Sequence, residues 1–411
     1  MKALPFGLRL SDVDWKLPTA ALLLSICGVL LIFSSQYYND DVNAHSLYLR
    51  QLFWLVGALG TFWVIISLPP RFFDFFAYIF YAVMVLLLAA VLVVGSTRMG
   101  ASRWFALGPL SFQPSEFAKL AVLLTLARFF AYTKLPPASK RRLALSFILI
   151  IIPAALILKQ PDLGTSLVYF VILFSLWYFS GIRPLYLLLI LSPILSLVAA
   201  FHWLAWTIYL ILLLAVLFLG RPGLLFSVVV TVVNLGFGLL TPLVWNHLAD
   251  YQKMRILIFL DPGQDPQRAG YQIIQSIISI GSGGLFGKGF LGGSQTRLEY
   301  LPARHTDFIF CVMGEEIGFI GGAIIIMLFG YIIFRGLKIA SKCRSLFLAT
   351  IAWGAVTIIF FQMVVNIGMA LGLMPVTGLP LPFVSYGGTS LVFFWILIGL
   401  MVIAERHWQE H

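Results

Sequence analysis

Residues 271–316 read YQIIQSIISIGSGGLFGKGFLGGSQTRLEYLPARHTDFIFCVMGEE, and they form the core of the longest interruption in a chain of otherwise nearly continuous apolar segments. Seven glycines lie within 281–293, and a run of hydrogen-bonding residues leads from there to the His-Thr-Asp sequence at 305–307, just before the next apolar segment. Glycine backbone is flexible, and its polar groups are costly to leave unpaired in apolar surroundings. We therefore expect this stretch to carry the function of the protein.

The composition predicts an all-α, polytopic membrane protein. Of the 411 residues, 61% are hydrophobic and only 10% are charged, and the mean hydropathy is +0.98, whereas a soluble protein has about 25% charged residues. The net charge of +11 does not indicate nucleic-acid binding, because the lysines and arginines lie mostly in short loops between apolar segments. The three cysteines have neither metal-ligand spacing nor the pattern of a disulfide set. We expect one domain over residues 1–411.

Apolar runs for about twelve membrane spans follow one another along the chain, since a span needs about 20 apolar residues. They begin near Leu17, Leu49, Phe73, Ser115, Arg142, Leu163, Pro184, Trp203, Leu224, Phe308, Ser345 and Thr389. The first run lacks a cleavage site and is expected to be retained as a span. Arg183 and Arg221 enclose 37 uncharged residues, which predict two short spans with a turn at His202. One long tilted helix with a re-entrant piece is the alternative.

The distribution of charge gives the orientation of these spans. With the N-terminus inside, the inner loops hold most of the lysines and arginines, including the clusters at 134–142 and 335–344, and the first outer loop holds acidic residues at 40–41. This distribution obeys the positive-inside rule. It places both termini inside and the long loop 247–307 outside, in an extracytoplasmic position.

A first polar stretch, RMGASRWFALGPLSFQPSEFAK at 98–119, precedes and enters the fourth span. Pro114 suits the first turn of a helix, and Glu116 lies in that turn, where the helix dipole favours a carboxylate. Lys119 follows three residues later on the same helix face. The two side chains form either a structural ion pair between helices or part of a wet cavity, since ionisable residues at membrane depth usually face such a cavity or the bundle interior.

Two further polar stretches interrupt the apolar pattern. The sequence KQPDLGT at 159–165, with Asp162 at its centre, breaks the chain between two spans. The sequence GLMPVTGLPLPFVSYGGTS at 372–390 contains prolines that force an extended path. Before it, Gln362 and Asn366 lie four residues apart and therefore share one face of the eleventh span.

Asp307 is the strongest candidate for a catalytic residue, because it lies where the long outer loop enters the tenth span. The alternative is a helix N-cap, for which Asp and Thr are preferred, and a capping aspartate can still act as a base. Arg304 and His305 precede it, and Glu315 and Glu316 lie about two turns deeper. A carboxylate near an apolar boundary loses solvation and becomes a better proton acceptor.

Arg103 and Lys288 are candidates for holding an anionic group, with anchoring to lipid headgroups as the alternative. The glycine run at 281–293 has neither the strand–helix context nor the Lys-Ser/Thr pair of a nucleotide-binding loop. It is expected instead to provide backbone that follows a large polar ligand or a neighbouring helix closely.

Over nearly its whole length the chain resembles the SEDS family of cell-wall polymerases, which includes RodA, FtsW and SpoVE, and it is most similar to the RodA members. The similarity is carried by FQPSEFAKL at 112–120, QPDLGTS at 160–166, AGYQIIQSIISIGSGGLFGKGF at 269–290, LPARHTDFIF at 301–310 and NIGMALGLMPVTGLPLPFVSYGGTS at 366–390. The resemblance implies a peptidoglycan glycosyltransferase of the bacterial cytoplasmic membrane that polymerises lipid II at the outer face for cell elongation.

The resemblance also implies roles and partners. The essential aspartate of the family corresponds to Asp307, which takes the proton from the acceptor hydroxyl. The substrate-binding candidates, by resemblance or by position, are Glu116, Lys119, Arg103, Asp162, Lys288, His305 and Ser385. The leaving pyrophosphate needs cations, either the Arg and Lys side chains among these or a divalent ion such as Mg²⁺ or Mn²⁺, whose ligands the sequence does not identify. The implied partners are lipid II, glycan linked to undecaprenyl pyrophosphate, and a class B penicillin-binding protein.

One departure from the family concerns the number of spans. The family has ten, whereas this chain has room for twelve, and the extra pair falls between Gly164 and Asp250. An inserted pair preserves the sidedness of everything after it. Two other functions remain open at this point: a transporter that flips lipid II, which polar groups at depth and broken helices also suit, and a non-catalytic scaffold.

Overall fold

The computed structural model describes residues 13–38, 46–98, 101–107, 110–247, 253, 269–297 and 303–407. The first outer loop and the long-loop residues 248–252, 254–268 and 298–302 therefore lie outside the described residues, apart from the ends of the first loop. The elements are α1 (Lys16–Gln36), α3 (Leu47–Ser67), α4 (Pro70–Val94), β1 (Ser96–Arg98), β2 (Ala101–Leu107), β3 (Leu110–Phe112), α5 (Pro114–Tyr132), α6 (Lys140–Lys159), α7 (Leu163–Phe179), α8 (Pro184–Ala199), α9 (Trp203–Gly220), α10 (Leu224–His247), α12 (Ala269–Ser282), α13 (Ser294–Arg297), α14 (Ile309–Glu316), α15 (Gly318–Lys342), α16 (Leu346–Ala370) and α17 (Gly388–Arg406).

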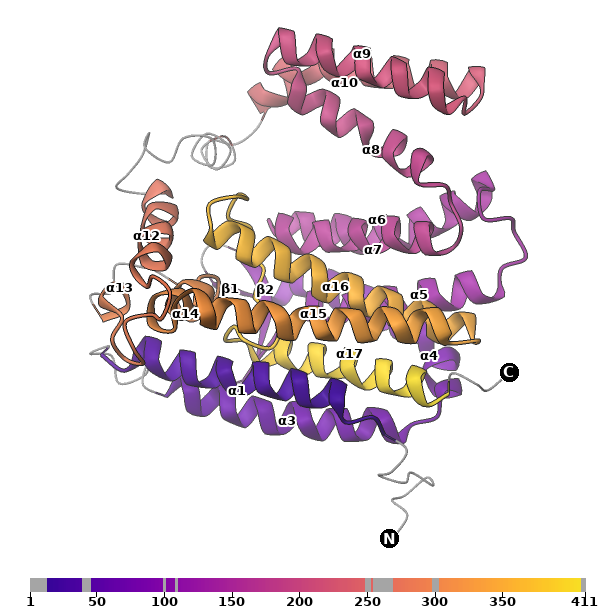
Figure 1. The fold of residues 1–411 in the computed structure, drawn as a ribbon. Coiled ribbons are helices and arrows are strands. Elements are labelled where there is room, and N and C mark those ends of the chain that lie inside the picture. Colours follow the sequence, from indigo (N-terminus) through magenta and orange to yellow (C-terminus); the bar gives the residue numbers. More distant parts are fainter. Residues whose placement is uncertain are drawn as a thin grey trace.

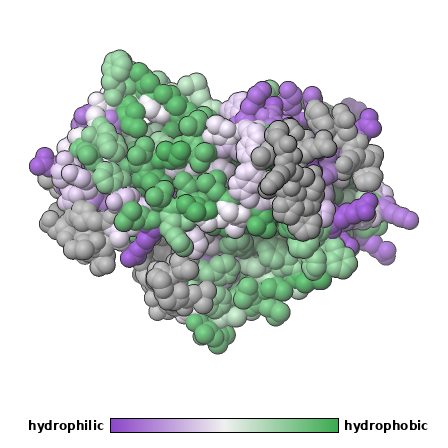
Figure 2. All heavy atoms as spheres, turned by 90° about the horizontal axis from the view of Figure 1, so that it is seen from below, coloured by the Kyte–Doolittle hydropathy of each residue, from purple (hydrophilic) through white to green (hydrophobic). Residues whose placement is uncertain are grey.

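The expectation of a polytopic helical bundle is confirmed (Figure 1). In the described part of the chain, nine helices are long and apolar enough to cross a membrane, α7 and α8 are shorter apolar helices, and α5 occupies the fourth predicted span. The face in Figure 2 is mostly apolar across its middle, and hydrophilic side chains gather towards its two ends. This distribution fits a protein surrounded by lipid. The strands β1, β2 and β3 add a small antiparallel sheet between α4 and α5.

The main bundle has one continuous apolar core to which α1, α3, α4, α5, α7, α16 and α17 all contribute. Helix α17 is buried along nearly its whole length, which places it at the centre of this bundle. Helices α12 and α14 lie together at the end of the bundle where α15 begins (Figure 1). The basic loops predicted to face inside lie at the opposite end, where α15 and α17 finish.

The apolar region that follows α7 folds as three helices, α8, α9 and α10, whose main contacts are with one another (Figure 1). Two short helices separated by a turn with His202 at the N-cap of α9 confirm the prediction of two spans, and the alternative of one long helix is wrong. Asn234 is fully buried among the three helices. Its Nδ2 donates to Ser192 Oγ at 2.8 Å, and its Oδ1 accepts from the Tyr209 hydroxyl at 2.7 Å. Polar contacts of this kind hold helices together in lipid.

The tenth span is interrupted between α14 and α15, and the backbone of the glycine run forms hydrogen bonds with the chain at this interruption. Helix α14 ends at Glu316 and α15 begins at Gly318. The amides of Lys288 and Gly289 donate to the carbonyls of Glu315 and Glu316 at 2.9 and 3.0 Å. The amide of Phe319 in turn donates to the Gly284 carbonyl at 2.9 Å. The glycine run was expected to follow either a large polar ligand or a neighbouring helix closely. In the structure it follows the neighbouring helices α14 and α15.

Gly287 is the position in this run where a side chain is least tolerable. Its φ is +77°, and a Cβ there would overlap with the Glu316 carbonyl. Gly284 has a φ of +59° with open space around the Cβ position, and Gly57 lies in α3, also with open space.

We predict that Gly287→Ala lowers the free energy of unfolding by more than Gly284→Ala, which should lose about 1–2 kcal/mol through its left-handed backbone alone. Gly57→Ala should be neutral or stabilising, because alanine is the better helix former. Thermal unfolding of the three purified variants in detergent measures the order. Equal stability of the Gly287 and Gly57 variants would contradict this account of the interruption.

Candidate active site at the Asp307 end of the bundle

Asp307 lies in the loop just before α14 and is half-buried. The helix begins with Phe308 at its N-cap, so Asp307 does not occupy the capping position that the alternative interpretation requires. Its backbone carbonyl accepts a hydrogen bond from Asn366 Nδ2 at 3.0 Å. A Cβ at Gly378 would lie 3.7 Å from the Asp307 carboxylate, so the loop 372–387 passes directly beside it.

Asn366 fastens two loops at once. Its Nδ2 also donates to the Leu379 carbonyl at 2.8 Å, and its side chain is fully buried near the C-terminal end of α16. One amide group therefore fixes both the loop that carries Asp307 and the loop that carries Leu379. Asn366 was expected only to share a face with Gln362, and its sequence position gives no indication of these partners.

Ser385 and Tyr386 complete the attachment of the two loops. Ser385 Oγ donates to the Thr306 carbonyl at 2.6 Å and accepts from the Leu381 amide at 2.9 Å. The Tyr386 amide donates to the His305 carbonyl at 2.9 Å. The hydroxyl of Ser385 is thus already engaged within the protein, and its contacts position the residues next to Asp307.

His305 lies beside Asp307 with its imidazole in contact with other side chains. Nδ1 lies 3.2 Å from Gln36 Nε2, and the ring packs edge-on against Tyr386 with 5.7 Å between ring centroids. Burial lowers the pKa of the His305 imidazole, and the positive charge of Arg304 lowers it further. The neutral imidazole is therefore favoured at neutral pH, and its Nδ1 accepts the hydrogen bond from Gln36.

Glu116 and Lys119 form an ion pair within α5, and not between two helices as the structural interpretation expected. Lys119 Nζ lies 2.8 Å from Glu116 Oε1, both side chains are buried, and the ammonium lies 4.7 Å from the centre of the Phe393 ring. The Tyr169 hydroxyl donates to the carbonyl of Ser115, immediately before Glu116, at 2.9 Å. The positive charge of Lys119 is therefore balanced inside the protein.

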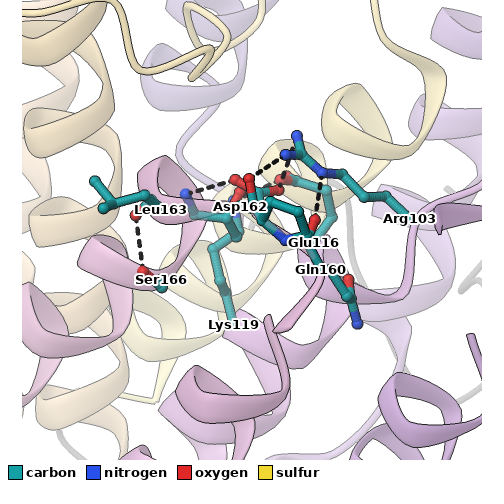
Figure 3. Close-up of polar contacts among 9 residues, drawn as sticks. Arg103, Glu116, Lys119, Gln160, Asp162, Leu163 and Ser166 are labelled. Carbon is teal, nitrogen blue, oxygen red and sulfur yellow. Dashed lines mark hydrogen bonds and ion pairs between the residues drawn. The ribbon is translucent and has the colours of Figure 1, made fainter. Parts of the chain in front are cut away.

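Arg103 and Asp162 form a second pair, shown with the first in Figure 3. Arg103 Nη1 lies 3.7 Å from Asp162 Oδ2, and its Nε donates to the Gln160 carbonyl at 3.0 Å. Asp162 also caps α7, because its Oδ1 accepts from the Thr165 amide at 3.1 Å. The contact of the Tyr169 hydroxyl on α7 with the Ser115 carbonyl on α5 brings the N-terminal ends of these helices, and with them the two pairs, close together.

The stretch around Asp162 abuts the loop beside Asp307. A Cβ at Gly164 would overlap with the carbonyl oxygen of Thr377, which precedes Gly378. The structure thus brings the polar stretches of the sequence to one end of the bundle, with the loop 372–387 between Asp162 and Asp307. Lys288 joins this end by a different pair: its Nζ contacts Glu315 Oε1 at 2.7 Å and Ser294 Oγ at 2.8 Å.

A group of buried polar atoms remains without a hydrogen-bond partner in the described part of the chain. They include both amide atoms of Gln362, Glu116 Oε2, Ser115 Oγ, Asn366 Oδ1 and Thr377 Oγ1. Buried polar groups normally have partners, so this group of atoms is unusual and marks the interior beside Asp307 as a candidate place for a polar ligand. A metal site is not built in: among the described residues, no three His, Cys, Asp or Glu side chains are grouped to hold an ion.

The level of Gln362 follows from the packing of α5 against α16. These helices run in opposite directions, as the fourth and eleventh of twelve spans, and Gly354 leaves no room for a Cβ beside Leu123. Both helices rise about 1.5 Å per residue. Gln362 lies eight positions after Gly354 on α16, and Ser115 lies eight positions before Leu123 on α5. Because the two helices are antiparallel, Gln362 and Ser115 lie at the same level of the bundle.

The fold and the site define a class: a many-spanning helical membrane protein with a braced carboxylate and a buried polar interior at one end. The family model for the cell cycle proteins FtsW, RodA and SpoVE matches residues 14–208 and 204–410. The chain is 39% identical over 387 residues to the peptidoglycan glycosyltransferase MrdB of Escherichia coli K12, covering 94% of this chain and 91% of that protein. It is 35% identical over 431 residues to the peptidoglycan glycosyltransferase RodA of Treponema pallidum, covering 95% and 97%.

Solved structures agree with these relatives. A chain of a peptidoglycan synthase complex, studied for the coordination of polymerization and crosslinking, matches with a TM-score of 0.71 and 33% identity over 97% of this chain and 99% of its own. The rod shape determining protein RodA of Thermus thermophilus matches with a TM-score of 0.64 and 29% identity over 97% and 98%. The chain belongs to the FtsW/RodA/SpoVE family.

The buried pair of Glu116 and Lys119 gives a prediction for stability. Removing one partner leaves a buried charge without its counter-charge, so Glu116→Gln should cost roughly 3–5 kcal/mol, and the double variant Glu116→Gln/Lys119→Met should be more stable than either single variant. The pair of Asp74 and Arg128 is more exposed, with side chains 22% and 28% accessible, and it serves as the control. Asp74→Asn should cost about 0–1 kcal/mol.

Thermal unfolding and polymerisation are measured on the same preparations. Recovery of stability without activity in the double variant indicates that the charges act in the reaction as well as in the fold. Recovery of both would assign the pair to structure alone. Equal stability of all three variants would contradict the coupling itself.

Proposed function

We infer that this chain is a peptidoglycan glycosyltransferase that polymerises lipid II into glycan strands during cell elongation. Family membership and the names of its relatives MrdB and RodA support the reaction class and its role in elongation. The observation that carries the proposal for this chain is the position of Asp307: a half-buried carboxylate on a loop held by Asn366 and Ser385, at the mouth of a bundle with unpartnered polar groups inside.

In the proposed reaction Asp307 removes the proton from the acceptor hydroxyl of lipid II. The hydroxyl oxygen forms a bond to the anomeric carbon of the donor sugar, and the bond from that carbon to the pyrophosphate breaks. The donor pyrophosphate leaves with its undecaprenyl chain, and the proton stays on the Asp307 carboxylate until it passes to solvent. General-base catalysis of this kind contributes about 10²–10⁴-fold to a rate.

The other candidate residues take modified roles in this proposal. Lys119, Arg103 and Lys288 already have carboxylate partners, so they stabilise the departing pyrophosphate as members of ion pairs. A divalent cation has no built-in ligand set among the described residues, so we assign no step to it. Glu116 Oε2 and the Gln362 amide are proposed to bind sugar hydroxyl and amide groups. Asp162, His305 and Ser385 position their neighbours.

We propose a class B penicillin-binding protein as the partner that crosslinks the new strand. Support comes from the similar chain that was solved in a synthase complex. The protein is proposed to lie in the bacterial cytoplasmic membrane with Asp307 at the outer face, where the lipid-linked precursor is polymerised. The positive-inside distribution of the loops supports this orientation.

Purified full-length protein in detergent, given lipid II and no second enzyme, tests the reaction. The wild-type protein should form polymer, and Asp307→Asn should keep the fold but lose at least about 10²-fold in rate, because the isosteric amide does not accept the proton. Asp74→Asn, at a distant ion pair, should retain the wild-type rate. A folded wild-type protein that forms no polymer would favour a transporter or a scaffold, and normal activity of the Asp307 variant would remove the general base.

Labelling of single cysteines tests the orientation. In a background without Cys27, Cys311 and Cys343, cysteines are placed at Ser294, the first residue of α13, and at Ala138 between α5 and α6, both exposed. An impermeant thiol reagent added to intact cells or spheroplasts should label position 294 and leave position 138 unmodified. The reverse pattern would invert the topology and contradict polymerisation at the outer face.

A further inference from the structure

A cavity of about 290 Å³ lies at the other end of the bundle from Asp307, where the N-terminal end of α1 meets the C-terminal ends of α15 and α17. In Figure 1 these three ends meet at the right, away from α12 and α14. The cavity is lined by Asp14, Arg335, Lys338, Ile339, Lys342 and Glu405. None of these residues belongs to the site around Asp307.

Arg335 connects the three helices at this cavity but does not use all of its donors. Its Nη2 contacts Glu405 Oε1 at 2.6 Å and also contacts Asp14 Oδ2. Arg335 Nε and Glu405 Oε2 are both buried and have no hydrogen-bond partner within the described ranges. Both residues line the cavity, so one guanidinium donor and one carboxylate acceptor beside it lack the partner that buried polar groups normally have.

The charges of the lining favour an anion. Three cationic side chains and two carboxylates line the cavity. Lys338 and Lys342 are exposed, lie four residues apart on one face of α15, and end that helix, where cations are favoured. The side chain of Lys338 forms no ion pair with any residue that the structure describes. A ligand that satisfies the lining carries a phosphate for the cations and a hydroxyl for Glu405 Oε2.

We propose that this cavity binds a phosphoglycerol group. Its phosphate oxygens accept from Arg335 Nε and from the ammonium groups of Lys338 and Lys342, and its glycerol hydroxyl donates to Glu405 Oε2. The volume of about 290 Å³ is just below the roughly 300–1,000 Å³ of small-molecule sites, so it holds a headgroup and not acyl chains. The basic loops put this end at the inner face of the membrane, where anionic lipid headgroups are abundant.

A ligand in this cavity is expected to affect the site around Asp307, because α1, α15 and α17 extend from the cavity to that site. At its outer end, α1 places Ser34 in hydrogen-bond contact with Glu316 and Gln36 next to His305. Helix α15 starts at the interruption that follows α14, and α17 starts directly after the loop beside Asp307. A ligand that holds the inner ends of these helices together is therefore expected to raise the thermal stability of the whole frame.

Native mass spectrometry of the full-length protein in detergent measures the binding. Phosphatidylglycerol should bind more tightly than phosphatidylcholine, and Lys338→Gln/Lys342→Gln should weaken it by about 30-fold, as expected for two cations near an anionic headgroup. The matched control is Lys140→Gln/Arg141→Gln, two exposed cations at the same membrane face at the start of α6. It should retain wild-type affinity within about twofold.

A second arm separates the two sources of the ligand. Inorganic phosphate and glycerol 3-phosphate are added to lipid-depleted protein: binding of glycerol 3-phosphate without a preference for phosphatidylglycerol assigns the site to a soluble ligand of the same chemistry. Equal losses in both double variants, or no selectivity in either arm, would overturn the proposal. Wild-type unfolding temperatures of both double variants in the absence of lipid ensure that a loss of binding is not a loss of fold.

Discussion

The side-chain amide of Asn366 is the contact on which the Asp307 end of this protein depends. It donates to the carbonyls of Asp307 and Leu379 at 3.0 and 2.8 Å from a fully buried position. Both carbonyls belong to non-helical segments, and backbone groups at membrane depth must find partners within the protein. Because a single amide satisfies both, the loop with Asp307 and the loop 372–387 are fixed relative to each other and to α16. The carboxylate of Asp307 is thereby held at a defined place beside Gly378.

Much of the fold was predictable because it follows from local sequence. Apolar run length gave the helices, Pro114 marked the start of α5, and the spacing of three residues placed Glu116 next to Lys119. The two short helices on either side of His202 also followed from length alone. The small sheet could not be predicted, because β1 and β3 have only three residues each and show no alternation of apolar and polar residues.

The contacts that build the site were not predictable, because their partners are far apart in the chain. Asn366 and Ser385 reach residues 59 and 79 positions away, and Lys288 pairs with Glu315 across 27 positions. Sequence marks such residues as polar and costly to bury but does not identify the partner. For that reason the sequence predicts Ser385 and Lys288 only as substrate-binding residues, and the contacts that both make within the protein appear only in the structure.

Helices α8, α9 and α10 form a group of their own beside the main bundle. Helices α8, α9 and α10 share a small apolar cluster and the hydrogen bonds of Asn234, and their main contacts are with one another. Lipid offers no hydrophobic drive for association, so packing and polar contacts of this kind must hold the helices together. None of the residues described at the site around Asp307 lies on these three helices.

The central claim is that Asn366 fixes Asp307 for catalysis. Steady-state polymerisation of lipid II by Asn366→Ala, compared with Thr357→Val, tests it most directly. Thr357 lies on the same helix and loses an equivalent interhelical contact, with Ser175 at 2.6 Å, away from the site. Asn366→Ala should lower kcat by about 10²-fold, as a misplaced catalytic group does, with a smaller change in KM, and Thr357→Val should keep the wild-type kcat. Equal kcat values in the two variants at comparable stability would contradict the claim.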